Sequence, residues 1–134
     1  MGKPIKTEKV AKVAKAAANG TSIAHLAADI ILDKKGTDLL VLDISECCDL
    51  ADYMVIASGS NKRQVQAMGE EIRKQVKAHK VVPLSVNGLD NGWWVLLDCG
   101  SVLVHIMQPE ARRFYNLESL WADGVVVRRG VDAA

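Results

Sequence analysis

The stretch that decides the fold is GWWVLLDCGSVLVHIM, residues 92–107. Two apolar runs flank a Cys-Gly pair, which predicts a β-hairpin with Cys99-Gly100 as a two-residue loop. This register pairs Asp98 with Ser101 and Trp94 with His105, and successive residues point to opposite faces. One face is then wholly apolar: Trp93, Val95, Leu97, Val102, Val104 and Ile106. The other face is mixed: Trp94, Leu96, Asp98, Ser101, Leu103 and His105.

A register shifted by one residue would mix apolar and polar side chains on both faces, so the segregated pattern is favoured. We therefore expect Trp93 in the core and Trp94 on the opposite face. Two interpretations of the Trp94 face remain open. Either a second helix layer covers it, or a partner protein does, because a tryptophan among aliphatic and a few polar groups is typical of an interface hot spot.

Outside the hairpin, apolar periodicity predicts further helices and strands. We expect a helix from Thr21 or Ser22 to Lys34-Lys35-Gly36, strands at 39–44 and 53–57, a helix after 58–61, and a short strand at 81–86. The two helices carry apolar stripes: Ile23, Leu26, Ala27, Ile30, Ile31, and Val65, Met68, Ile72, Val76. Pro109 suits a helix N-terminus and leads into Phe114, Leu117, Leu120 and Trp121. This order predicts an α/β fold, a mixed β-sheet flanked by helices, in one domain over residues 20–134.

Charge is unevenly distributed along the 134 residues. Residues 1–19 contain five lysines and one glutamate, whereas residues 20–134 contain 12 basic and 15 acidic side chains. We expect residues 1–19 to be a flexible, lysine- and alanine-rich tail, with an arm that touches RNA or acidic protein as the weaker alternative. The slightly acidic body argues against binding a specific nucleic-acid sequence.

The composition also indicates where the protein is located in the cell and whether it binds a metal ion or cofactor. No apolar run approaches the roughly 20 residues that a membrane span needs, and no signal-peptide pattern is present, so we expect a cytoplasmic protein. Three cysteines without Cys-x-x-Cys spacing fit a reducing compartment. Three scattered histidines give no metal-ligand pattern. We therefore expect no metal and no cofactor.

Catalytic patterns are weak throughout. His105 and Asp98 share the mixed face but are separated along the hairpin, and no nucleophile elbow occurs. The turn Ser58-Gly59-Ser60-Asn61 joins a strand to a helix, where anions can bind, but it lacks a phosphate-loop motif. A plain helix cap explains this turn better. We interpret the pairs Arg112-Arg113 and Arg128-Arg129 as solvated surface charge.

Five blocks of the chain together resemble one known family: ADYMVIASGS (51–60) with the helix after it, PLSVNG (83–88), WVLLDCGSVLVHIM (94–107) and RRFYNLESLW (112–121). Their order and spacing are similar to the Iojap-related proteins, the ribosomal silencing factors, called RsfS in bacteria. The resemblance covers about residues 22–122. It implies a nucleotidyltransferase-like fold without the catalytic motif. Gly59-Ser60 and Gly100-Ser101 are not followed by the Asp-x-Asp pair that holds metal ions in active transferases, and no such pair occurs in the chain.

The resemblance implies a non-enzymatic repressor of translation. Family members bind the large ribosomal subunit through its protein numbered fourteen and sterically block subunit joining. The family's motif residues fall on Trp94, Asp98, His105 and Tyr115, while Cys99 and Ser101 depart from its pattern. With the aliphatic neighbours of Trp94, the expected partner-binding residues are Trp94, Leu96, Asp98, Leu103, His105 and Tyr115.

Three alternatives accompany this expectation. The first is a nucleotide-binding or nucleotidyltransferase-type enzyme that uses the cleft of the fold. The second is an RNA-binding adaptor that works through residues 1–19. The third concerns assembly: an exposed Trp94 face would also permit a homodimer of the free protein.

Overall fold

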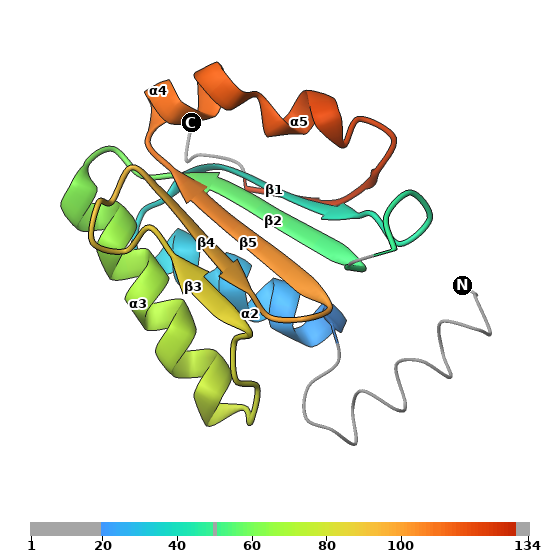
Figure 1. The fold of residues 1–134 in the computed structure, drawn as a ribbon, viewed down its shortest axis with the longest axis horizontal. Helices are drawn as coiled ribbons and strands as arrows, with labels where there is room; N and C mark the ends of the chain where they lie inside the picture. The colour runs from blue at the N-terminus through green and yellow to red at the C-terminus, as the bar shows by residue number, and fades with distance from the viewer. Residues whose placement is uncertain (1–19, 50, 131–134) are drawn as a thin grey trace.

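The computed structural model describes residues 20–49 and 51–130. Within them the helices are α2 (Gly20–Asp33), α3 (Lys62–Ala78), α4 (Pro109–Tyr115) and α5 (Leu117–Leu120). The strands are β1 (Thr37–Asp43), β2 (Tyr53–Ser58), β3 (Ser85–Asn87), β4 (Trp94–Asp98), β5 (Val102–Met107) and β6 (Val125–Arg129). They form one sheet in the order β3-β4-β5-β2-β1-β6 (Figure 1). β2 and β5 run parallel and the other neighbours antiparallel, which confirms the mixed sheet flanked by helices.

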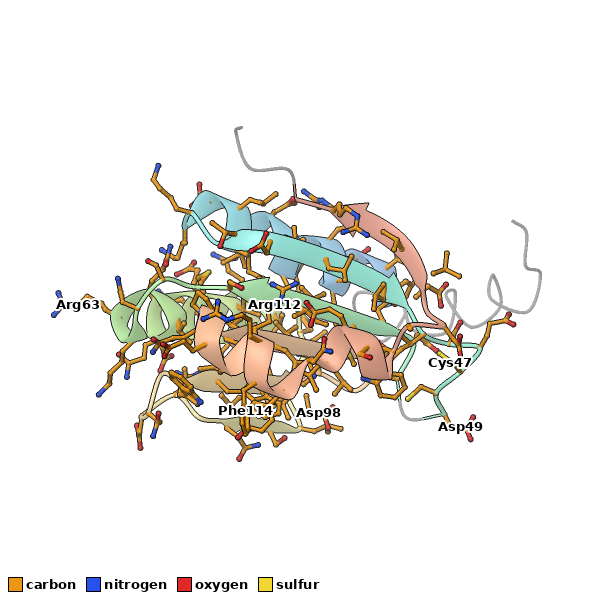
Figure 2. The ribbon with its side chains drawn as sticks, turned by 90° about the horizontal axis from the view of Figure 1, so that it is seen from above. Cys47, Asp49, Arg63, Asp98, Arg112 and Phe114 are labelled. Atoms are coloured by element: carbon orange, nitrogen blue, oxygen red, sulfur yellow. The ribbon has the colours of Figure 1, made fainter. Side chains whose placement is uncertain are left out.

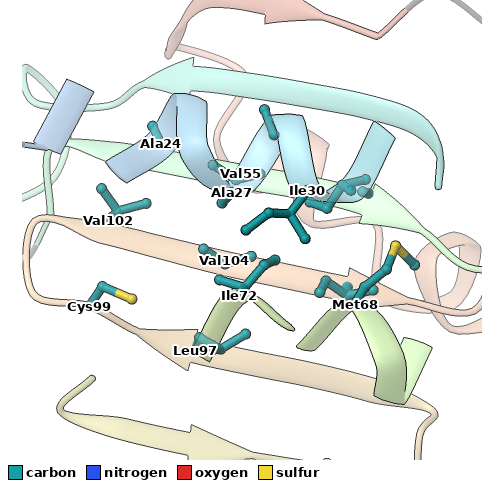
Figure 3. Close-up of a cluster of buried hydrophobic side chains, with 14 of the residues drawn as sticks. Ala24, Ala27, Ile30, Val55, Met68, Ile72, Leu97, Cys99, Val102 and Val104 are labelled. Carbon is teal, nitrogen blue, oxygen red and sulfur yellow. The ribbon is translucent and has the colours of Figure 1, made fainter. Parts of the chain in front are cut away.

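Helices α2 and α3 pack on the apolar face of the hairpin. Both expected stripes are in place: Ile23, Ala27 and Ile31 of α2 and Met68 and Ile72 of α3 are at most 2% exposed. They meet a layer of strand residues in one continuous core that includes Val55, Leu97, Val102, Val104 and Ile106 (Figure 3). Close packing of these side chains supplies most of the hydrophobic stabilisation of the domain.

The opposite face of the sheet carries a second, smaller core. Leu40, Leu42, Ile44, Ala51, Met54 and Ile56 form this cluster, and Leu103, Leu117 and Trp121 pack against it. The expected helix after Pro109 is divided at Asn116, which adopts the left-handed conformation with φ 48°. Phe114, near the end of α4, is 79% exposed and does not join the second core, whereas Leu117 and Trp121 do.

The hairpin keeps its expected faces but not its expected register. Asp98 pairs with Leu103, Leu96 with His105, and Trp94 with Met107. The loop is Gly100-Ser101, because Gly100 takes the positive φ of 84° that Cys99 would adopt at a cost. The Asp98 carboxylate accepts the Gly100 N–H at 3.0 Å and fixes this turn. Each pair is displaced by two residues, so the alternation of faces survives.

Trp93 does not enter the core. Its side chain is 37% exposed, and β4 begins only at Trp94. The alternation rule applies inside a strand, and Trp93 precedes the first ladder pair. The bend before it is set by Gly88 (φ 87°) and Gly92 (φ 68°), and a Cβ on Gly88 would collide with the Trp94 carbonyl. The expected core position of Trp93 is therefore wrong.

The two edges of the sheet differ from expectation. β3 is shorter than the expected strand at 81–86, and Pro83 lies outside it, as a residue without an N–H donor would. β6 was not expected at all; it pairs with β1 at the other edge, and Val125, Val126 and Val127 are 62%, 47% and 41% exposed. Among the described helices, none has the length and apolarity to cross a membrane. Residues 1–19, the expected tail, lie outside the described part.

Candidate functional site

The mixed face of the hairpin centres on Trp94, which sits between two other rings. Its indole N–H donates to Nδ1 of His105 at 3.0 Å, with the ring centroids 5.8 Å apart. On its other side lies Tyr115 of α4, with a centroid separation of 4.6 Å. Phe114 packs edge-on against Tyr115 at 4.9 Å. Two neighbours therefore hold Trp94 in one orientation while its side chain stays partly exposed.

His105 lies beneath this surface rather than on it. The residue is only 6% exposed, and burial lowers its pKa from 6.5 to about 4. The ring is thus neutral near pH 7, and because Nδ1 accepts the Trp94 N–H, the ring proton is on Nε2. His105 orients Trp94, so its expected role as a residue in direct contact with a partner does not fit its burial.

The remaining expected residues form what we call the Trp94 surface: Trp94, Leu96, Asp98, Leu103 and Tyr115. The structure places them along one face: Tyr115 contacts Trp94, Leu96 pairs with the histidine under Trp94, and Asp98 and Leu103 pair with each other at the far end of β4. Trp94, Leu96, Asp98 and Leu103 are partly exposed, and Tyr115 is 46% exposed. Helices α4 and α5 cover its β1, β2 and β5 side, and the β4 side remains accessible. The helix interpretation therefore holds for part of this face, and the partner interpretation stays a prediction.

The turn from β2 into α3 is a helix cap, as expected. The Asn61 side chain accepts the Gln64 N–H at 2.9 Å, and Gln64 in turn accepts the Ser60 N–H at 2.6 Å. A Cβ on Gly59 would lie 2.7 Å from Cγ2 of Val65, so glycine is needed there for close packing. Side chains thus already occupy amides that a phosphate loop would offer.

Sequence reasoning missed the part played by Arg112. Its guanidinium is not solvated surface charge: the side chain is 12% exposed, and Nε donates to Glu118 at 2.7 Å. Nη1 donates to the Asp38 carbonyl at 2.6 Å and to the Ser58 hydroxyl at 3.0 Å. Arg112 therefore joins α4 and α5 to β1 and β2. No local pattern could have revealed this, because two of its partners are 54 and 74 residues away along the chain.

Arg128 likewise contacts α2 instead of solvent alone. Its guanidinium donates to Asp29 at 2.8 Å and lies 3.1 Å from Nδ1 of His25.

In the described residues no three or more His, Cys, Asp or Glu side chains form a group that could hold a metal ion. Of the cysteines, Cys47 is exposed, Cys48 half-buried and Cys99 buried.

The chain as a whole is similar to several known proteins. A family model described as "Ribosomal silencing factor during starvation" matches residues 12–133. Ribosomal silencing factor RsfS of Bacillus subtilis is 39% identical over 105 residues, which span 78% of this chain and 89% of that protein. The mouse protein named "Mitochondrial assembly of ribosomal large subunit protein 1" is 30% identical over 95 residues, 69% of this chain and 42% of that protein. A crystal structure of a Chromobacterium violaceum protein is similar with a TM-score of 0.74 and 36% identity, covering 85% of this chain and 94% of that one.

Proposed function

Because the chain belongs to the family of ribosomal silencing factors, we propose that it represses translation by binding the large ribosomal subunit. The contact is made with the large-subunit protein numbered fourteen, and the bound domain fills space that the small subunit needs. The protein acts in the cytoplasm. The mechanism is occupancy, so it requires no bond-making step and no cofactor.

The observation that carries this proposal is the partly exposed, immobilised Trp94. Interface hot spots are enriched in tryptophan and tyrosine that are already fixed before binding, because ordering a side chain costs free energy. Trp94 is fixed by the hydrogen bond to His105 and by a tilted ring contact with Tyr115. Leu96 follows on the same face of β4 as Trp94, and Asp98 and Leu103 pair with each other at the far end of that strand. The proposed contact area thus has an apolar part next to Trp94 and a polar group at its border.

The names of relatives support the large subunit as the partner. The mouse relative is named for assembly of the ribosomal large subunit, and the Bacillus relative is named as a ribosomal silencing factor. The rival function, nucleotidyl transfer, rests only on the resemblance of the family to the nucleotidyltransferase fold. Nucleotidyl transfer needs paired carboxylates for divalent ions, and the sequence contains no Asp-x-Asp pair. Mg²⁺-dependent turnover by the pure protein would support the rival.

The test is co-sedimentation with separated ribosomal subunits, comparing wild type with Trp94→Ala. We expect wild type to sediment with the large subunit and Trp94→Ala to bind about 30-fold more weakly, as loss of roughly 2 kcal/mol at a hot spot implies. Trp93→Ala is the matched control, because that neighbouring tryptophan precedes the strand. Equal sedimentation of wild type and Trp94→Ala, or binding of wild type to the small subunit alone, would contradict the proposal.

A second assay separates binding from blocking. Purified subunits are mixed at a Mg²⁺ concentration that permits joining and are resolved on a sucrose gradient. We expect wild type, but not Trp94→Ala, to reduce the joined fraction. Sedimentation velocity of the free protein tests self-association through the same surface, since a Trp94-mediated homodimer would dissociate on substitution of Trp94.

A further inference from the structure

A cleft at one end of the sheet lies outside the Trp94 surface. β2 and β5 are parallel neighbours that end together, with Ser58 opposite Met107. β2 continues into α3, which packs on one face, whereas β5 continues into α4, on the other face. Connections that leave adjacent parallel strands toward opposite faces mark a topological switch point, near which open α/β sheets commonly bind ligands. The cleft begins at Ser58, the last residue of β2, and extends on the α4 and α5 side of the sheet toward β1 and β6.

The cleft at this position has the size of a small-molecule site. Its volume is about 400 Å³, within the range of ligand pockets. Its floor includes Ser58, whose hydroxyl is buried and bonded to Arg112. The walls come from β1, α4, α5 and the end of β6, and the lining residues used below are Asp38, Ser58, Arg112, Arg113, Glu118 and Arg129.

The charges in this cleft do not balance. Arg112 is neutralised by Glu118 at 2.7 Å. Within residues 20–49 and 51–130, neither Arg113 nor Arg129 forms an ion pair, and both are exposed. The carboxylate of Asp38 is the remaining negative group on the wall. Two arginines from different elements, α4 and β6, therefore face one cleft with a single carboxylate against them.

The backbone around the cleft is also unusual. Asp38 (φ 51°) and Asn116 (φ 48°) are two non-glycine residues in the left-handed region, and both line it. Asp38 lies at the irregularity of β1 where its pairing with β2 shifts register, and its carbonyl accepts from Arg112. Uncommon backbone conformations held by surrounding contacts cluster at ligand sites.

We propose that this cleft binds a small molecule carrying a diphosphate group, with Arg113 and Arg129 each taking one phosphate. The planar guanidinium matches phosphate oxygens with two parallel hydrogen bonds, and two separate guanidiniums match two linked phosphates. Arg112 and Ser58 form a fixed floor beneath them. Binding here involves no chemical step, and it does not depend on the Trp94 surface or on the proposed function.

The test is isothermal titration calorimetry of the full chain with pyrophosphate and, separately, ADP at constant ionic strength. Arg113→Gln and Arg129→Gln should each weaken binding roughly tenfold or more. Arg63→Gln is the matched control, because Arg63 projects from α3 away from Arg112 (Figure 2). Tighter binding of ADP would support the site with nucleotides as its ligands, and tighter binding of pyrophosphate would support it with the free anion.

Three results would overturn the proposal. The first is no heat of binding for either compound up to millimolar concentrations. The second is equal weakening by Arg63→Gln, which would indicate unspecific attraction to positive charge. The third is equally tight binding of sulfate, which would show that the cleft does not select two linked phosphates. Thermal unfolding of each variant without ligand verifies that the exposed substitutions leave the fold intact.

Discussion

The neutral, buried His105 predicts how stability depends on pH. Burial lowers the pKa of this ring from 6.5 to about 4. Between these pH values the ring is neutral in the folded protein and protonated in the unfolded chain. Because the folded pKa is the lower one, the stabilisation is complete above pH 6.5 and is lost as the pH falls toward 4. One pKa unit corresponds to about 1.4 kcal/mol, which gives a total loss of about 3 kcal/mol and about 2 kcal/mol by pH 5.

The perturbation that isolates this effect is His105→Gln. Glutamine does not titrate, but its amide oxygen can still accept the Trp94 N–H. Urea unfolding followed by far-UV circular dichroism gives the free energy of unfolding of both proteins at about pH 7.5 and about pH 5, and the wild type should lose about 2 kcal/mol more than the variant over that interval. Carboxylates titrate in both proteins, so the difference reports His105 alone.

One result would refute this reasoning. If wild type and His105→Gln lose the same free energy between the two pH values, then His105 is not held neutral in the folded protein. Protonation would convert Nδ1 from an acceptor into a donor facing the Trp94 N–H, and the hydrogen bond that orients Trp94 could not persist.

Two further predictions concern residues of opposite exposure. Burial raises the pKa of the Cys99 thiol to about 11, with the Asp98 charge as a lesser cause. Cys99 should therefore react with a thiol reagent only on unfolding, whereas the exposed Cys47 should react in the native state. Mass-spectrometric mapping of the labelled cysteines after a timed pulse of reagent distinguishes the two. Trp93→Ala should cost only about 1 kcal/mol of unfolding free energy, against about 2–5 kcal/mol for Ile72→Ala in the core, as chemical denaturation would measure.

Much of the fold was predictable because periodicity is a local property. The stripes of α2 and α3 and the two faces of the hairpin follow from spacings of 3.6 and 2 residues. The hairpin register could not be predicted, because it depends on which loop residue takes a positive φ. The hydrogen bond from the Gly100 N–H to the Asp98 carboxylate favours Gly100 in that position. β6 was missed although its Val125–Val127 run is rich in β-branched residues, since an exposed edge strand shows no apolar alternation.

The candidate site was likewise predictable only in part. Trp94, Leu96, Asp98 and Leu103 could be placed on one surface from alternation, and the structure keeps them there. The buried orienting role of His105 and the bridging role of Arg112 could not be predicted. Both depend on tertiary packing, which places Tyr115 over Trp94 and brings Asp38 and Ser58 to one guanidinium.

The hydrogen bond between Trp94 and His105 has a thermodynamic consequence for any partner. The indole has one donor, and that donor is already used inside the protein. A partner at this surface can therefore bind Trp94 only through the area of its ring. Association of that kind buries apolar surface and gives a negative heat-capacity change. Its affinity depends only weakly on ionic strength, because few charges are screened.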